Sequence, residues 1–277
     1  MKCAFKILLL ASFVIGTVQA ELHPSDDRKS KGPDSPKFLD AVGRLTVYNA
    51  LTKKVNYCGA TLVGFTSDRK SRIVVTSDHC IQGNKKSWKT TTKSGKIIDR
   101  KIVKVLDSDS LSDYAILLLD DHVEPSDVAP LIIDYEGGDS VDRMIGRGGE
   151  AVVAGYSADK ELGQGGKVLT YDDSIESIGS CDDEEKCPVG GSTRGATTYS
   201  GASGGAAIVT FESPKANVNK GIQHYFVGPI KGGLSDHFVS SNGVRGSDNT
   251  IFTFHERFWN PLFDHLVEYN GAVEGIE

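Results

Sequence analysis

The stretch GATLVGFTSDRKSRIVVTS (59–77) contains two short runs of apolar and β-branched residues separated by a polar turn. Runs of this length, bounded by Gly, Ser and Asp, are typical of neighbouring β-strands. Similar runs recur along the chain: RLTVYN (44–49), KIVKVL (101–106), YAILLL (114–119), EAVVAGY (150–156), KVLTYD (167–172), AAIVTF (206–211) and HYFVGPI (224–230). The pattern predicts an all-β barrel or sandwich, because alternating helical segments are missing between the runs.

One helix is predicted near the C-terminal end, in FHERFWNPLFDHLVEYNG (254–271). Its apolar residues recur at spacings of three and four: Phe258, Leu262, Leu266 and Tyr269. The pair Asn270-Gly271 supplies a helix stop. Pro261 should interrupt the early part, so we expect the regular helix to begin there.

Residues 1–20 have the pattern of a secretory signal peptide. Lys2 and Lys6 precede the apolar run LLLASFVIG (8–16), and small residues lead to an expected cleavage site after Ala20. The apolar run is too short for a membrane-spanning helix, which needs about 20 residues. An uncleaved anchor is the alternative. We expect a secreted protein, extracellular or periplasmic, without membrane attachment after cleavage.

Removal of this segment changes the charge and the cysteine count. The formal net charge of the whole chain is −6, and it becomes −8 because residues 1–20 carry two Lys and no acid. Four cysteines then remain: Cys58, Cys80, Cys181 and Cys187. In an oxidising compartment they predict two disulfides, for which three pairings are possible. A mildly acidic chain without a basic stripe argues against nucleic acid as the main partner.

Three separate motifs contain residue types that could act together in acyl transfer. TYSGASGGAAIV (198–209) places Ser203 among small residues, TSDHCIQG (76–83) contains His79 after an apolar run, and SDYAILLL (112–119) begins with Asp113. A nucleophilic serine needs a base and a group that orients the base, and His and Asp supply both. Taken singly, each residue has an ordinary reading as a turn, surface or core residue.

Together, and in the order His, Asp, Ser, the motifs TSDHC, SDYAILLL and GASGG resemble the catalytic motifs of chymotrypsin-fold serine proteases. The resemblance covers about residues 42–270. It implies an all-β fold of two six-stranded antiparallel β-barrels with the site between them, followed by a C-terminal α-helix. GYSADK (155–160) is similar to the bacterial, glutamyl-endopeptidase-like branch of the family.

The resemblance also implies a division of the chain. We expect the N-terminal barrel at 42–130 and the C-terminal barrel with its helix at 131–277. Residues 21–41 form a polar extension or propeptide, and its composition predicts that it has no order of its own.

The roles implied by the resemblance concern the three motif residues and one glycine. Ser203 would attack the acyl carbon, His79 would take its proton, and Asp113 would fix the imidazole tautomer. The N–H groups of Gly201 and Ser203 would form the oxyanion hole. Protein or peptide substrates are expected, with no metal, no organic cofactor and a monomeric enzyme.

The substrate pocket is also placed by resemblance. Its base would hold Thr197 and Thr198, and GPIKGGL (228–234) would supply its wall through Ile230, Lys231 and Gly233. No carboxylate is expected at the base, which argues against cleavage after Lys or Arg.

Two disulfides are expected within this framework. The pair Cys58–Cys80 matches the family's disulfide beside the catalytic histidine. CDDEEKC (181–187) is interpreted as an acidic loop closed by Cys181 and Cys187. The basic stretch KKSWKTTTKSGK (85–96) is interpreted as a solvated hairpin.

One departure from the family separates this chain from the digestive enzymes. They carry an Asp before the nucleophile that pairs with a newly cut N-terminus, and here Ala202 stands at that position. We therefore expect no activation of that kind. Two alternatives stay open: a catalytically weak homologue acting as a binding or inhibitory protein, and an esterase on the same fold.

Overall fold

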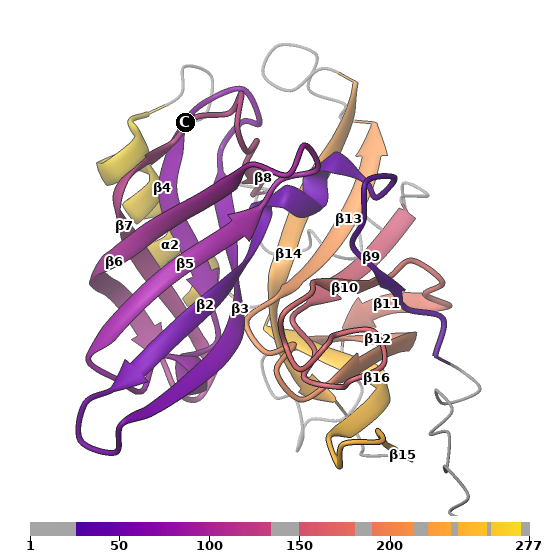
Figure 1. Cartoon of the computed structure of the whole chain (residues 1–277). Coiled ribbons are helices and arrows are strands. Elements are labelled where there is room, and N and C mark those ends of the chain that lie inside the picture. The colour runs from indigo at the N-terminus through magenta and orange to yellow at the C-terminus, as the bar shows by residue number, and fades with distance from the viewer. Residues whose placement is uncertain are drawn as a thin grey trace, which may run out of the picture.

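The computed structural model describes residues 26–133, 150–180, 190–212, 221–233, 238–253 and 256–272. Within these ranges the chain forms two groups of antiparallel strands that lie side by side, with one helix behind the first group (Figure 1). Residues 1–20, Cys181 and Cys187 lie outside the described residues, so the signal peptide and the second disulfide stay predictions.

The first group is a closed six-stranded barrel. Its strands are β2 (Val42–Asn49), β3 (Lys54–Gly64), β4 (Ser71–Thr76), β5 (Lys85–Thr91), β6 (Ile97–Asp109) and β7 (Tyr114–Val123). They pair in the order β3–β2–β5–β6–β7–β4, and a further β3–β4 ladder closes the circuit. This confirms the mostly β fold and the first barrel predicted from the sequence.

The second group contains shorter strands. They are β9 (Glu150–Gly155), β10 (Thr170–Asp172), β11 (Ser177–Ser180), β12 (Gly190–Tyr199), β13 (Ala206–Glu212), β14 (Ile222–Gly233), β15 (Phe238–Val239) and β16 (Arg245–Thr253). The pairing runs β10–β9–β13–β14–β16–β12–β11. Within the described residues the ladder is interrupted between β10 and β11, so a closed second barrel stays a prediction.

The two groups are joined through a short strand, β8 (Leu131–Ile132). It pairs in parallel with β3 of the barrel and with β14 of the second group. A shared core of buried apolar side chains extends across this junction, from Leu62 and Ile73 to Ile208 and Phe226. The groups are therefore packed into one body, and their relative position is fixed by both pairing and burial.

The basic stretch 85–96 does form a hairpin, since β5 and β6 are neighbours. It is less solvated than predicted, because Trp88 is fully buried and its indole N–H donates to the Ala60 carbonyl at 2.9 Å. The isolated aromatic residue in a polar stretch thus belongs to the barrel core.

The C-terminal helix α2 (Glu256–Asn270) packs on the barrel, beside β4 (Figure 1). Phe258, Leu262 and Leu266 are fully buried, as the helical spacing predicts. The predicted start at Pro261 is wrong, because the helix already begins at Glu256 and includes the proline. The carbonyl of Arg257, whose helical partner would be the missing N–H of Pro261, accepts a hydrogen bond from the Tyr114 hydroxyl at 2.8 Å.

The N-terminal extension is ordered from residue 26, contrary to the prediction from its composition. Strand β1 (Lys29–Ser30) pairs with β10 of the second group, and the short helix η1 (Lys37–Ala41) leads into β2 of the barrel. Between them, Lys31 contacts the buried Asp40 carboxylate at 2.6 Å. Figure 1 shows this indigo segment crossing from the second group to the barrel. The Lys31–Asp40 pair, together with the long-range pairs Arg28–Asp159 and Lys29–Asp173, holds the segment in place despite its few apolar residues.

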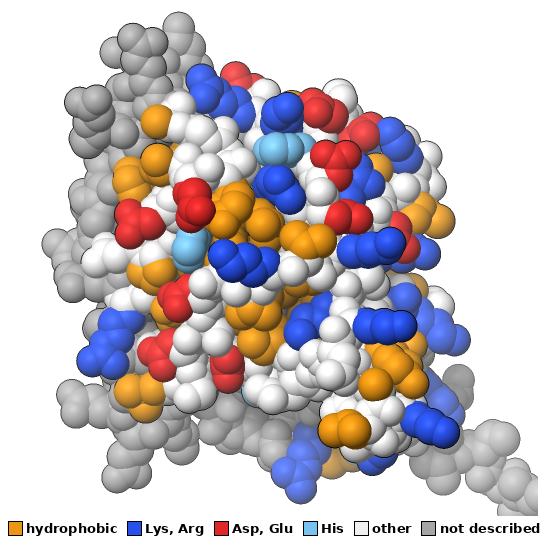
Figure 2. Space-filling view, turned by 90° about the vertical axis from the view of Figure 1, so that its left-hand side faces the viewer, with side chains coloured by type: hydrophobic (Ala, Val, Ile, Leu, Met, Phe, Trp, Pro, Cys, Tyr) orange, Lys and Arg blue, Asp and Glu red, His pale blue; other side chains and the backbone are white. Residues whose placement is uncertain are grey.

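The surface of the barrel side carries mixed charge. Figure 2 shows basic and acidic side chains interspersed over this face, with apolar side chains between them. Among the described residues, no helix is long and apolar enough to cross a membrane.

Candidate active site

His79 and Asp113 are brought together by two neighbouring strands of the barrel. His79 lies in the short helix η2 (Asp78–Cys80), which directly follows β4, and Asp113 directly precedes β7. Because β4 and β7 are paired, with Thr76 opposite Ala115, the two residues lie at the same end of the sheet. The pairing of β4 with β7 therefore places His79 and Asp113 next to each other.

The contact between them is specific. The His79 ring nitrogen Nδ1 lies 2.8 Å and 3.0 Å from the two Asp113 carboxylate oxygens, and the His79 backbone N–H also donates to that carboxylate at 3.0 Å. An ionised carboxylate only accepts hydrogen bonds, so Nδ1 carries the proton and Nε2 is left with a lone pair in the neutral ring. The Asp113 side chain is 9% exposed and that of His79 is 50% exposed, which leaves the ring accessible to a substrate.

Asp113 adopts an uncommon backbone conformation, with φ of 55°. This left-handed region is sparsely occupied by residues other than glycine, although Asp tolerates it better than most. Thr253 of β16 donates from its hydroxyl to the neighbouring Ser112 carbonyl at 2.5 Å. A strand of the second group therefore helps to hold the turn that presents Asp113 to the imidazole.

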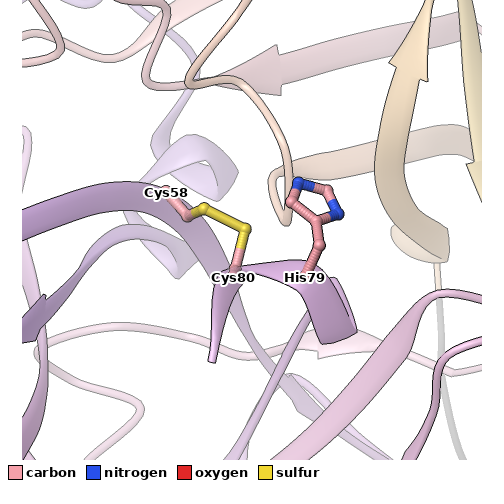
Figure 3. Close-up of side chains that lie close together, drawn as sticks. All are labelled: Cys58, His79 and Cys80. Atoms are coloured by element: carbon pink, nitrogen blue, oxygen red, sulfur yellow. A yellow bond between two sulfur atoms is a disulfide. The ribbon is translucent and has the colours of Figure 1, made fainter. Parts of the chain in front are cut away.

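Next to His79 lies the disulfide Cys58–Cys80, which confirms the predicted pairing. Figure 3 shows it joining β3 to the short helix that also carries His79. These three residues are the one group of potential metal ligands that the described part of the chain brings together. Both sulfurs are consumed by the disulfide, so only His79 could ligate a metal, and the cluster does not form a metal site.

Ser203 lies in the turn formed by residues 199–205, here called the Ser203 turn, between β12 and β13. Its carbonyl accepts a hydrogen bond from the N–H of Gly59 at 2.7 Å, and the next N–H, of Gly204, donates to Ile230 at 2.7 Å. Gly59 follows Cys58, whose disulfide partner follows His79. The turn from the second group is thus attached to the same edge of the barrel that carries His79.

Two glycines allow the turn to take this course. Gly201 has φ of 99°, and a Cβ there would lie 2.7 Å from the Tyr156 carbonyl oxygen. Gly204 has φ of 74°, and its Cβ would lie 2.1 Å from the Thr76 hydroxyl. Both positions therefore require glycine. Within the described part of the chain, the N–H groups of Gly201 and Ser203 donate to no protein acceptor, so both are available to a ligand oxygen.

Ala202 is 2% exposed and packs with Val153, Ala196 and Ile230. An alanine side chain cannot form the ion pair that a carboxylate would form at this position. The alanine that stands at position 202, in place of the digestive enzymes' Asp, therefore fits the apolar residues around it.

A pocket of about 190 Å³ opens beside Ser203. It is lined by Thr198, Tyr199, Ser200, Ala202, Ser203, Ile230, Gly232, Gly233, Arg245, Gly246 and Ser247. The predicted residues Thr198, Ile230 and Gly233 are among them. Thr197 and Lys231 are not; Thr197 is buried, and its N–H donates to Asp172 at 2.8 Å. Any substrate contact of Thr197 or Lys231 remains a prediction.

Sequence reasoning missed the wall that β16 contributes, which includes Arg245 and Ser247. The signal for this strand was the run TIFTF (250–254) before the C-terminal helix. Arg245 supplies the one formal charge among the described residues that line the pocket. The pocket is thus small, of mixed polar and apolar character, and free of carboxylates along this described lining.

Comparison with known proteins supports the fold. Protease Anisep from Arthrobacter nicotinovorans has a TM-score of 0.52 at 12% identity, covering 82% of this chain and 93% of Anisep. GrC gives 0.57 at 16%, covering 87% and 98%. The clip serine protease Grass of the Drosophila Toll pathway gives 0.54 at 12%, covering 89% and 73%. No protein-family model matches the sequence, and no curated protein matches it. Two of these neighbours, Anisep and Grass, are named as proteases, and at such low identity the likeness establishes the fold alone.

Proposed function

We propose that this chain is a secreted serine endopeptidase that hydrolyses peptide bonds through an acyl-enzyme intermediate. The observation that carries the proposal is the paired contact of the Asp113 carboxylate with Nδ1 and the backbone N–H of His79. It orients the imidazole and leaves Nε2 as the base, as a triad of this type requires. The fold neighbours, two of which are named proteases, support the same reading.

In the proposed reaction, Ser203 Oγ attacks the carbonyl carbon of the substrate while His79 Nε2 accepts the hydroxyl proton. The protonated imidazole, stabilised by Asp113, then delivers this proton to the leaving amine. The N–H groups of Gly201 and Ser203 stabilise the oxyanion of the tetrahedral intermediate. The same imidazole then accepts a proton from water, whose oxygen attacks the acyl carbon; the bond to Ser203 Oγ breaks, and the imidazole returns the proton to Oγ.

The pocket beside Ser203 is proposed to bind the side chain that precedes the scissile bond. Its described lining contains an arginine and no carboxylate, so substrates with Lys or Arg at this position are disfavoured. Profiling with a peptide library tests this, and efficient cleavage after Lys or Arg would contradict it. We also propose that the chain is related to the glutamyl-endopeptidase-like branch of the family. This part of the proposal rests on the similarity of GYSADK (155–160).

The decisive experiment is labelling with a fluorophosphonate probe that reacts with activated serines. We expect the protein to be labelled, and labelling to disappear in Ser203→Ala. Ser94→Ala is the control, since this exposed serine lies in the turn between β5 and β6 and is not among the residues that line the pocket, and it should retain labelling. A natural chain that is folded and unlabelled would refute the proposal and favour the binding-protein alternative. Labelling without peptide cleavage, but with ester hydrolysis, would favour the esterase.

A further inference from the structure

A buried charge cluster joins the N-terminal extension to the second group of strands. The Arg28 guanidinium donates to both Asp26 oxygens at 2.8 Å and to Asp159 at 2.9 Å. Its carbon Cζ lies 4.2 Å from the centroid of the Tyr199 ring. The side chains of Arg28, Asp26 and Asp159 are at most 1% exposed. A cation enclosed in this way fixes the position of everything it contacts, because any displacement leaves a buried charge unpaired.

Both protein elements held by Arg28 support the Ser203 turn. Tyr199 is the first residue of the turn, and its carbonyl accepts the N–H of Ala202 at 3.0 Å. Asp159 belongs to residues 156–166, here called the Asp159 loop, and accepts the N–H groups of Leu162 and Gly163. Arg28 therefore stacks on one end of the turn and pairs with the loop behind it.

The Asp159 loop contacts the turn where the oxyanion hole is proposed. The N–H of Ala158 donates to the Ser200 carbonyl at 2.8 Å, and Gly201 lies against the Tyr156 carbonyl. A shift of the loop would therefore move the peptide unit that directs the Gly201 N–H. Since Ala202 cannot form an ion pair, the residue directly before Ser203 does not perform this task.

The pKa values of Asp159 and Arg28 are shifted in the directions that favour their charged forms. Burial alone would raise the pKa of the Asp159 carboxyl, but the hydrogen bond and charge of Arg28 and two backbone N–H groups outweigh it, so the pKa is lowered. Burial likewise acts to lower the pKa of Arg28, and the hydrogen bonds to Asp26 and Asp159 outweigh it, so this pKa is raised.

We propose that Arg28 is a positioning residue for the oxyanion hole, and that residues 26–31 are a permanent part of the working enzyme. The proposal rests on the protease function proposed above. In this proposal, the Arg28 side chain, which lies within the extension, orders the Ser203 turn. The extension then supports activity, and its removal does not release activity.

The test compares Arg28→Gln and Arg28→Lys with Lys29→Gln. The Gln variant removes the charge, whereas the Lys variant keeps the charge and loses the planar fork and the stacking. Lys29 is the next residue along the chain and also pairs with an acid of the second group, but its partner Asp173 is exposed, so Lys29→Gln is the matched control. Each chain is produced at full length. Its fluorophosphonate labelling rate, kcat and KM are then measured, together with its thermal unfolding.

We expect Arg28→Gln to lower the labelling rate and kcat by about 10- to 100-fold with KM within about twofold, because misplaced oxyanion donors weaken transition-state binding. Arg28→Lys should fall between this variant and the natural chain, and Lys29→Gln should match the natural chain. If Arg28→Gln does not fold, Arg28→Lys decides, since it leaves no buried carboxylate without a cation. A folded Arg28→Lys with an unchanged labelling rate would overturn the proposal.

A second measurement separates this inference from the protease function. Hydrogen exchange of the amides in residues 199–205 requires no catalysis, and it should be faster in both Arg28 variants than in Lys29→Gln. An unlabelled natural chain would refute the protease function. Unchanged exchange in the turn would refute the positioning role, whatever the labelling shows.

Discussion

At the scale of single residues, the candidate site depends on backbone conformations that few amino acids adopt. Asp113 and Gly201 both have positive φ, at 55° and 99°. Asp113 is held in place by the hydrogen bonds around it, whereas Gly201 has neither a side chain nor room for one. The two positions should therefore respond differently to substitution, and Gly201 offers the cleaner test.

Replacement of Gly201 by Ala should abolish most activity. The new Cβ would meet the Tyr156 carbonyl at 2.7 Å in a conformation unfavourable for alanine, so the peptide unit must turn away. Loss of one oxyanion donor costs about 10²–10³ in kcat. Steady-state kinetics on a peptide substrate measure this loss. Gly179→Ala is the control, because a Cβ there would meet nothing within 4 Å, and it should be as active as the natural chain.

At the scale of elements, helix α2 is attached to the strand that begins next to Asp113. The Tyr114 hydroxyl lies 2.8 Å from both the Asp107 carboxylate and the Arg257 carbonyl, and these two acceptors share its single proton. The second bond compensates for the N–H that Pro261 cannot provide. A proline within a helix is thus accommodated by one hydroxyl from a neighbouring strand.

Tyr114→Phe should lower the free energy of unfolding by about 1 kcal/mol, the typical contribution of one hydrogen bond, because the groups that lose this donor are only partly buried. Chemical denaturation measures the change. Pro261→Ala restores an N–H to the helix, so Tyr114→Phe should cost less in the Pro261→Ala background than in the natural chain. Equal costs in the two backgrounds would contradict the compensation.

The disulfide is a second connection between elements. Cys58 and Cys80 are 22 positions apart, and a closed loop of that length stabilises by about 3 kcal/mol in the chain-entropy model. Replacing both with Ser should lower the free energy of unfolding by about this amount. Reduction of the natural chain should have a comparable effect. If unfolding of the doubly substituted chain were unchanged, the bond would have no role in stability.

The sequence predicted those elements whose signal is local. The barrel strands with long aliphatic runs, the helix and the contact partners His79 and Asp113 all follow from short motifs. Strands β12 and β16 have no such run, because threonines line part of their buried side; for example, Thr198 and Thr250 share a hydrogen bond at 3.0 Å. Hydropathy therefore did not reveal β16, and with it Arg245 was missed.

The extension was misjudged for a different reason. A polar segment is expected to stay unordered when it buries little apolar surface. Arg28 is ordered instead by Asp159, 131 positions away, and nothing in the local sequence points to that partner. Such a pairing becomes visible only when the fold is known.

At the scale of the whole molecule, each end of the described chain packs on the opposite half. The extension contacts the second group of strands through Arg28 and β1, and helix α2 packs on the first barrel. Ser71 of β4 and Asn270 of α2, 199 positions apart, are joined by a hydrogen bond at 2.9 Å. The stability of the molecule therefore includes contributions from both ends.

The contribution of the Arg28 cluster should depend on pH. Because the folded-state pKa of Asp159 is lowered, its contribution is complete above the ordinary Asp value of about 3.9 and is lost as the pH falls through the folded value. Asp159→Asn should therefore lower the free energy of unfolding at pH 6, by about 3 kcal/mol or more. Asp26 and Glu161 are the neighbouring acids, and both are retained in this variant.

The measurement is denaturant unfolding of both chains between pH 6 and pH 3. The difference in free energy of unfolding between the natural chain and Asp159→Asn should narrow below about pH 4, as Asp159 of the natural chain takes up its proton. Asp173→Asn serves as the control, since its pair with Lys29 is exposed and should contribute little at any pH. A difference that stays constant down to pH 3 would contradict the assignment.

Because each end of the described chain packs on the opposite half, the order of synthesis also constrains the order of folding. Ribosomes deliver Arg28 long before Asp159 and Tyr199, and they deliver the barrel strands before the helix α2 that packs on them. A nascent chain that has not yet reached Tyr199 therefore lacks both the partners of Arg28 in the second group of strands and the helix on its barrel. The extension can take its final place only after the second group of strands has been synthesised, so its ordering is a late step of folding.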